Sequence, residues 1–324
     1  MRPGPAVLAS FGAAAEPVSL PGGEGTAWQA GDIVLKPVGD PRAADWTAEV
    51  YLVLRERAAS DFRVPEPIRP ATGDRAADEG AAGNRAADDG AAGDRAAGDR
   101  AAGDQAVGGW VARDRASGAW AGWRWLPGEP ADWAGLSPCW PRLVTVSRAF
   151  HAALSGLPPP PWLGRDGTPW TVADQTAWGE RDPGDILASG HGIPAGLTGQ
   201  VRRLLAALRP VRTADQLVHG DLAGNVLFAE GQPPAVIDFS PYWRPAGLAV
   251  SVAAVDALTW SGADPAILDE LDGEPEVDQL LARAHIGRLV TEMIARRGNE
   301  TGLAEVERTA GPVTALVMTR LAVG

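Results

Sequence analysis

A cluster of polar residues near the middle of the chain has the composition of a chemically active turn. The segment LVHGDLAGNVLF places His219, Asp221 and Asn225 within one short stretch. The segment VIDFS, which follows closely, places Asp238 after apolar residues. Because the pieces around the turn resemble short strands, we expect Asp221, Asn225 and Asp238 to lie at one end of a small sheet. Carboxylate and amide oxygens of this kind suit Mg²⁺, which keeps several waters and takes other ligands from substrate phosphates.

The chain contains a single lysine, Lys36, although Lys and Arg together number 29. In the segment DIVLKPV, Val34, Lys36 and Val38 share one face of a period-two pattern, which predicts an ammonium on an apolar strand face. A compact ammonium and a planar guanidinium are not interchangeable at a close phosphate contact. We therefore interpret Lys36 as a phosphate ligand. The alternative is a lysine retained by chance on a surface strand.

The segment DWTAEVYLVLRERAA has apolar residues at helical spacing and predicts a helix after the lysine strand. Glu49 lies on the same side as Trp46 and would need a partner there. We interpret Glu49 as the residue that positions Lys36. The alternatives are that Glu49 is a solvated acid at the edge of the apolar stripe, or that Glu56, one heptad further on, has this role.

Phosphoryl transfer requires the same set of groups. It needs a metal, a cationic contact to the phosphates, and an acid that holds the acceptor hydroxyl in line. In this hypothesis Lys36 contacts the phosphates, Asp221 orients or deprotonates the hydroxyl, and Asn225 and Asp238 hold Mg²⁺. His219 would brace the turn through hydrogen bonds, with proton transfer as the alternative role.

The motifs HGDLAGN and IDFS, preceded by GGEGTAW and VLK, resemble the aminoglycoside phosphotransferase and choline kinase group of small-molecule kinases, including actinobacterial members. The resemblance covers nearly the whole chain in order. It implies the protein-kinase-like fold, with ATP and Mg²⁺ as cofactors. It also implies the following roles: Asp221 as the catalytic aspartate, Asn225 and Asp238 as metal ligands, and Lys36 with Glu49 at the nucleotide.

The segment PGGEGTAW resembles a reduced form of that group's glycine loop. The resemblance assigns Gly22, Gly23 and Gly25 to nucleotide binding, whereas a plain hairpin turn at this place would need no ligand. The metal strand ends in DFS rather than DFG, which concerns switching more than metal binding.

The turn after Asp221 is one residue shorter than in that group. Three residues, Leu222 to Gly224, stand between Asp221 and Asn225, where the group usually has four. We expect Gly224 to tighten the backbone, because glycine reaches conformations that other residues avoid, and so to return Asn225 to the metal.

The order of predicted elements indicates an α+β, two-lobed fold. Residues 1–126 would form a small β-rich nucleotide-binding lobe, and residues 127–324 a larger, mainly helical lobe for catalysis and acceptor binding. Residues 73–106 are low in complexity and predict a disordered insert. Joining its flanks, FRVPEPIRPATGD and GGWVARDRASGAW, gives two strands that read as one expanded hairpin.

Composition limits the classes of partner that the protein is expected to bind. The net charge of −12 disfavours nucleic acids and anionic membranes, and no apolar run is long enough to span a bilayer, so we expect a cytoplasmic protein. The single cysteine, Cys139, would be a buried filler. The oligomeric state is not predicted.

The 13 tryptophans allow two interpretations. The segment AGWRWLPGEPADW is the expected hinge between the lobes. Four tryptophans lie in or beside it, Trp120, Trp123, Trp125 and Trp133. They would pack the lobes together or stack on a ligand. The acceptor would be a small molecule with a hydroxyl: an amino sugar, another sugar or an amino alcohol. The sequence thus predicts an ATP- and Mg²⁺-dependent phosphotransferase that moves the γ-phosphate to this hydroxyl. The alternative is a pseudokinase that serves as a nucleotide-binding or scaffold module.

Overall fold

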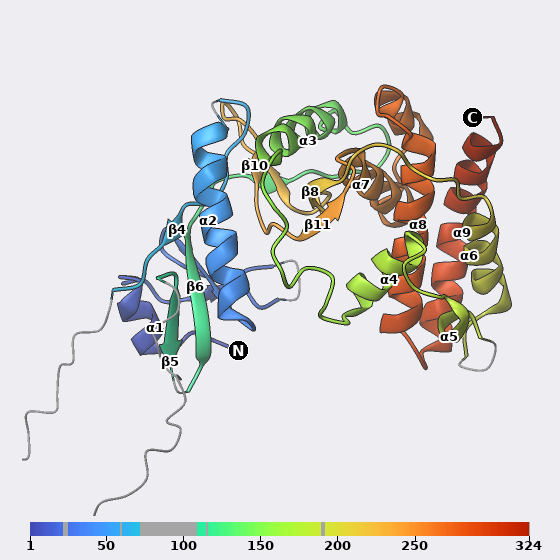
Figure 1. Ribbon diagram of the computed structural model, residues 1–324. Coiled ribbons are helices and arrows are strands. Elements are labelled where there is room, and N and C mark those ends of the chain that lie inside the picture. Colours follow the sequence, from blue (N-terminus) through green and yellow to red (C-terminus); the bar gives the residue numbers. More distant parts are fainter. Residues whose placement is uncertain (22–24, 59, 72–108, 115, 189–191, 324) are drawn as a thin grey trace, which may run out of the picture. The chain divides into compact units, whose positions relative to one another are not determined.

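The computed structural model describes residues 1–21, 25–58, 60–71, 109–114, 116–188 and 192–323 (Figure 1). Gly22, Gly23 and the predicted insert lie outside these residues. The chain divides into two compact units, Met1–Leu52 with Glu66–Trp125, and Val53–Pro65 with Leu126–Gly324. The predicted domain boundary after residue 126 stays a prediction.

The first unit is built around an antiparallel sheet. Its strand order is β1-β2-β3-β6-β4, and β5 also pairs with β6. The strands and helices are α1 (Pro5–Ser10), β1 (Val18–Ser19), β2 (Trp28–Ala30), β3 (Ile33–Pro37), α2 (Pro41–Arg57), β4 (Pro67–Ile68), β5 (Val111–Asp114) and β6 (Gly118–Arg124). The end of α2, from Val53 onward, is grouped with the second unit.

The core of the first unit explains the position of α1. Ile33 and Leu35 of β3 and Trp120 of β6 are buried together with Val7 and Phe11 at the N-terminus. A Cβ at Gly122 would come within 2.6 Å of the Phe11 ring, so glycine there lets the ring lie against β6. Tyr51 of α2 contacts the Trp123 ring edge-on at 5.2 Å, which places α2 beside β6 (Figure 1).

The strands on either side of the predicted insert do not form a hairpin with each other, so that prediction is wrong. Ile68 of β4 pairs with Gly122, and Val111 of β5 pairs with Ala121. The two strands therefore follow one another along the same edge of β6. The sequence pattern could not show this, because one edge strand and two short collinear ones have the same alternation.

The second unit is mainly helical. Its elements are β7 (Glu129–Pro130), α3 (Trp140–Leu154), α4 (Pro169–Ala177), α5 (Gly184–Leu187), α6 (Ala195–Ala206), β8 (Gln216–His219), β9 (Val226–Phe228), β10 (Ala235–Val236), β11 (Pro241–Arg244), α7 (Gly247–Trp260), the 3-10 helix η1 (Pro265–Leu271), α8 (Val277–Ala295) and α9 (Glu300–Val323). β10, β9 and β7 form one small sheet, and β8 pairs with β11. Helical spacing of apolar residues predicts five helices in this unit, in the segments RLVTVSRAFHAALSGL, LTGQVRRLLAALRP, GLAVSVAAVDALTW, VDQLLARAHIGRLVTEMIARR and GPVTALVMTRLAVG. The first four are confirmed as α3, α6, α7 and α8.

The last helix is longer than predicted. The pattern indicated a helix from residue 311, but α9 begins at Glu300 and contains Pro312. Buried Leu303 and Val306 continue the apolar stripe of Val313 and Val317, so packing maintains the helix across the proline. Within the described part of the chain, no helix is long and apolar enough to cross a membrane.

Candidate functional site

The loop between β8 and β9, residues 220–225, is fixed to its neighbours by its first residue. Gly220 donates its N–H to the carbonyl of Ser240 at 2.9 Å. A Cβ at Gly220 would meet the ring of Tyr242 at 2.2 Å, so any other residue would displace that ring. Burial raises the pKa of Tyr242 to about 12, so the phenol is protonated at neutral pH. Glycine before Asp221 is thus a packing requirement.

Asp221 is oriented on both carboxylate oxygens. Asn225 donates its Nδ2 to Oδ2 at 3.2 Å and to the backbone carbonyl of Asp221 at 2.7 Å. Arg288 of α8 donates Nη2 to Oδ1 at 3.0 Å. The side chain is nevertheless 51% exposed. The carboxylate is therefore both fixed in direction and accessible to a small molecule.

Two buried histidines, His219 and His151, support the 220–225 loop through hydrogen bonds. The N–H of Asp221 donates to Nδ1 of His219 at 3.2 Å, and Nε2 of His219 lies 3.0 Å from the carbonyl of Ile237. Because Nδ1 accepts, the proton of His219 is on Nε2. The N–H of His219 in turn donates to Nε2 of His151 at 3.0 Å. The predicted bracing role of His219 is confirmed, and its complete burial excludes direct proton transfer to an acceptor.

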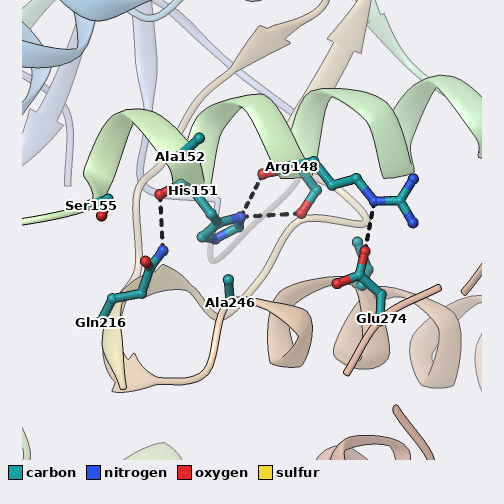
Figure 2. A pocket seen from close by; sticks show the side chains of 9 residues that line it. Arg148, His151, Ala152, Ser155, Gln216, Ala246 and Glu274 are labelled. Atoms are coloured by element: carbon teal, nitrogen blue, oxygen red, sulfur yellow. Dashed lines mark hydrogen bonds and ion pairs between the residues drawn. The ribbon is translucent and has the colours of Figure 1, made fainter. Parts of the chain in front are cut away.

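His151 completes this support as a neutral side chain. Its Nδ1 donates to the carbonyl of Ser147 at 2.7 Å (Figure 2). Burial lowers the pKa of His151 to about 4. A cavity of about 380 Å³ lies on this side. Figure 2 shows its lining, where Arg148 pairs with Glu274 and Gln216 donates to the carbonyl of His151. None of the predicted site residues lines that cavity.

Asn225 and Asp238 lie at the same end of one strand pair. Val226 of β9 pairs with Val236 of β10, and Ile237 donates its N–H to the carbonyl of Asn225 at 2.9 Å. The predicted strand through Asp238 ends earlier, at Val236. Asp238 itself has φ of 52°, in the left-handed region that favours glycine. Among the described residues other than glycine, Glu276 also has a positive φ, of 55°.

The short turn does not depend on the flexibility of Gly224, which corrects our expectation. The N–H of Asn225 donates to the carbonyl of Leu222 at 2.9 Å, closing an ordinary turn. Gly224 is not among the described glycines with positive φ, and its added Cβ would meet nothing within 4 Å. Asn225 reaches Asp221 because the turn is short, and most residues could replace Gly224.

The donor set at this end fits Mg²⁺. Asn225 supplies an amide oxygen and Asp238 a carboxylate, both of the hard type that this ion prefers. Among the residues with described positions, no group of three or more His, Cys, Asp or Glu is arranged to hold a metal. Two protein oxygens would therefore leave most positions around the ion to water and phosphate.

Lys36 and Glu49 belong to the first unit. Lys36 pairs with Ala121 across β3 and β6 and is partly exposed. As expected, Lys36 lies with Val34 on one half-buried face of β3, opposite the face that carries buried Ile33 and Leu35. Gly25 has φ of 66°, as a glycine turn requires.

Glu49 is on the exposed side of α2, with a side chain that is 61% exposed, rather than on its apolar side. It accepts a hydrogen bond from Nε1 of Trp110 at 2.8 Å and lies 3.9 Å from Arg69. The buried side of α2 instead carries Ala48, Val50, Tyr51 and Leu54. Its assignment as the partner of Lys36 stays a prediction.

Two of the tryptophans near the expected hinge, Trp120 and Trp133, pack within their own units. Trp120 is fully buried in the core of the first unit. Trp133 contacts Trp140 and Phe228, and its Nε1 donates to the carbonyl of Ala223 at 2.7 Å, which adds a further support for the 220–225 loop. Cys139 is only partly buried, at the start of α3, and is not a core filler.

Sequence reasoning missed Arg288 and Asp256. Arg288 binds Asp256 of α7 through Nε at 2.8 Å and Nη2 at 2.6 Å, and the same Nη2 reaches Asp221. A signal was present, since Asp256 is the single charged residue in the apolar segment GLAVSVAAVDALTW. A lone acid in a buried helix needs a cationic partner.

Phosphotransferases are among the solved structures that share this architecture. A thermostable mutant of aminoglycoside phosphotransferase APH(4)-Ia matches with a TM-score of 0.56 at 15% identity, over 95% of this chain and 97% of that one. The chain has the fold of the aminoglycoside phosphotransferases. APH(2")-IIia in complex with GDP and kanamycin matches that fold with a TM-score of 0.55 at 14% identity, over 95% and 97% of the two chains.

A third structure with the aminoglycoside phosphotransferase fold is spectinomycin phosphotransferase APH(9)-Ia with ADP and spectinomycin. It matches with a TM-score of 0.51 at 12% identity, over 96% of this chain and 95% of that one. The expected α+β class and the expected fold are confirmed. No protein-family model matches the chain, and no curated protein matches it in sequence.

Proposed function

We propose that this protein is an ATP- and Mg²⁺-dependent phosphotransferase that moves the γ-phosphate to a hydroxyl group of a small molecule. The observation that carries the proposal is the state of Asp221, an accessible carboxylate whose two oxygens are held by Asn225 and Arg288. The aminoglycoside phosphotransferase fold over nearly the whole chain supports the same reaction class.

In this proposal Asp221 accepts a hydrogen bond from the acceptor hydroxyl and takes its proton as the oxygen attacks the γ-phosphorus of ATP. The bond from this phosphorus to the β–γ bridging oxygen breaks in the same step, and ADP leaves. Orientation of the carboxylate before the acceptor binds removes part of the entropic cost of reaction. Mg²⁺, when held by Asn225 and Asp238, would neutralise charge on the phosphates. Lys36 would contribute a cationic contact to the nucleotide, with Glu49 as its positioning acid, and Gly22, Gly23 and Gly25 would lie at the phosphates.

The acceptor class is proposed more broadly than the antibiotics named for the structural neighbours. Kanamycin and spectinomycin are bound by APH(2")-IIia and APH(9)-Ia, and amino sugars are therefore one candidate class. Other sugars and small amino alcohols are the remaining candidates. We propose a cytoplasmic enzyme, since nucleotide and acceptor would both be available there, and no nucleic acid or membrane partner.

The test is turnover of ATP and GTP with Mg²⁺, with and without a panel of hydroxylated metabolites, followed by product mass. We expect one acceptor class to gain 80 Da and the gain to vanish in Asp221→Ala. Thermal shift with nucleotide and Mg²⁺ should be retained in this variant, because a ligand that binds the folded state raises its stability.

The pseudokinase alternative predicts a different result. A scaffold module would show the nucleotide-dependent thermal shift but no transfer to any acceptor. The sequence feature that favoured this alternative was the short turn, and its weight is reduced by the contact between Asn225 and Asp221. Turnover that is unchanged in Asp221→Ala would overturn the proposed role of Asp221.

A further inference from the structure

Arg288 is a largely buried cation that binds two acids from different elements. Its side chain is 14% exposed, and its guanidinium binds Asp256 in a bidentate manner and Asp221 through Nη2. Burial alone would lower the pKa of Arg288, but attraction to Asp256 and Asp221 raises it above its ordinary value. The guanidinium is therefore charged whenever the protein is folded.

Asp256 fixes the direction of this guanidinium. Both atoms of the fork, Nε and Nη2, are used at 2.8 and 2.6 Å, which sets the guanidinium plane. Burial raises the pKa of Asp256, and the charge and hydrogen bonds of Arg288 oppose this shift. The helices that carry the pair, α7 and α8, pack directly on each other. Because the plane is set, the N–H that points to Asp221 is in place before any ligand arrives.

The far side of Arg288 is covered by an exposed ring. Trp170 of α4 lies with its ring centroid 5.4 Å from Cζ of Arg288 and is itself 47% exposed. A cation over an indole face gains a further electrostatic contact. Arg288 is thus constrained from three directions, by Asp256, Asp221 and Trp170.

We propose that Arg288 is the positioning residue of Asp221, with Asp256 as its buried anchor. Arg288 fixes Oδ1 and Asn225 fixes Oδ2, so the carboxylate cannot rotate away from an incoming hydroxyl. The inference rests on the proposed phosphotransferase function. It goes beyond it by assigning a residue on α8, 67 positions after Asp221, to the geometry of the reaction.

The experiment compares Arg288→Gln with Arg244→Gln. Arg244 is a matched control, since it is also a buried arginine between two acids, Asp174 and Glu180, but has no described contact with Asp221. Turnover of ATP with Mg²⁺ is measured at saturating nucleotide and normalised to folded protein. We expect kcat of Arg288→Gln to fall by about 10- to 100-fold with little change in the KM for ATP, as expected for loss of one charged hydrogen bond.

The control and the conservative variant separate positioning from folding. Arg244→Gln should lose thermal stability but keep kcat. Arg288→Lys should recover part of the loss, because it restores the charge without the fork. Equal kcat losses in Arg288→Gln and Arg244→Gln, or wild-type kcat in Arg288→Gln, would overturn the inference while leaving the proposed function intact.

A double variant separates the loss of the contact with Asp221 from a general loss of structure. If Arg288 acts through Asp221, then Asp221→Asn with Arg288→Gln should be no slower than Asp221→Asn alone. Multiplying losses would overturn the proposal. Should Arg288→Gln fail to fold, Asp256→Asn frees the guanidinium at nearly constant volume, and its kcat should fall with unchanged KM. Wild-type protein without Asp221-dependent turnover would instead refute the proposed function, and the inference with it.

Discussion

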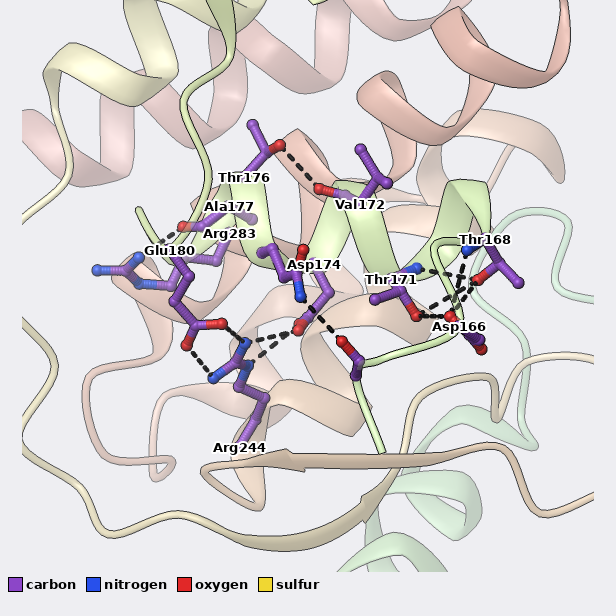
Figure 3. A network of polar contacts seen from close by, with 12 residues as sticks. Asp166, Thr168, Thr171, Val172, Asp174, Thr176, Ala177, Glu180, Arg244 and Arg283 are labelled. Carbon is purple, nitrogen blue, oxygen red and sulfur yellow. Dashed lines mark hydrogen bonds and ion pairs between the residues drawn. The ribbon is translucent and has the colours of Figure 1, made fainter. Parts of the chain in front are cut away.

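Two largely buried arginines of the second unit, Arg244 and Arg288, each lie between two acids but differ in their surroundings. Arg244 lies between Asp174 and Glu180, stacks on Trp178 and closes a polar network around α4 (Figure 3). Arg288 lies between Asp256 and Asp221. Its Cζ is 5.4 Å from the ring centroid of Trp170, whereas Cζ of Arg244 is 4.8 Å from that of Trp178. Both acids of the first arginine are structural partners, whereas one acid of the second is the proposed base. The same ionic device thus serves stability in one place and orientation of a reacting group in the other.

The difference between the two arginines is tested most strongly by replacing one acidic partner of each. Asp221→Asn should reduce turnover by about 10²- to 10⁴-fold, the range for loss of a general base. Asp174→Asn, the equivalent change at Arg244, should leave kcat per folded molecule near wild type. Steady-state ATP turnover checks both. Similar activity losses in the two variants would mean that the networks do not differ in function.

Removal of Arg244 tests its structural role. Arg244→Met should lower the free energy of unfolding by about 3–5 kcal/mol, because it leaves the buried Asp174 without its cation. The control is Arg124→Met, which removes an exposed pair with Asp32 and should lower it by at most about 1 kcal/mol. Urea denaturation measures both, and equal losses would contradict the assigned burial of the Arg244 network.

Acid sensitivity should come from buried histidines rather than from either arginine. Unfolded His151 binds a proton near its ordinary pKa of 6.5, whereas the folded side chain does so only at about 4. Between these values the unfolded state binds more protons, so stability is complete above pH 6.5 and decreases as the pH falls toward 4. The total loss from this group is about 3 kcal/mol.

Urea denaturation at a series of pH values checks this prediction. His151→Gln keeps an acceptor near the N–H of His219. It should reduce the pH dependence of the free energy of unfolding by the contribution of His151. His285 is fully buried, has its pKa lowered to about 4 by burial, and should account for a similar share in His285→Gln. A wild-type slope in His151→Gln would show that this histidine is not the source.

The smallest effect on stability is expected for a substitution of Asp238, whose backbone has the left-handed conformation. Asp238→Gly relieves the left-handed conformation and should change the free energy of unfolding by no more than about 1 kcal/mol, in the stabilising direction. Turnover should nevertheless be lost with the proposed metal ligand. Denaturation and ATP turnover are measured on the same samples. Retained turnover would remove Asp238 from the proposed site.

Local patterns determined much of this protein. The alternation in DIVLKPV gave β3, helical spacing gave α3, α6, α7 and α8, and the HGD and IDF motifs identified a loop in which Asp221 and Asn225 do meet. These signals depend on residues within a few positions of each other, and such spacing is readable without coordinates. The same alternation placed Lys36 with Val34, and the structure has both on the half-buried face of β3, opposite buried Ile33 and Leu35.

Only the tertiary structure decided how distant residues complete the site. Arg288 and Asp221 are separated by 67 positions, Trp133 and Ala223 by 90, and His151 and His219 by 68. An arginine on a helix face gives no sequence signal of which acid it will bind, since any exposed charge has the same local pattern. Burial selects the partner, because a guanidinium taken out of water must be paired. Packing of α7 on α8 brings Asp256 to Arg288, and the 220–225 loop brings Asp221.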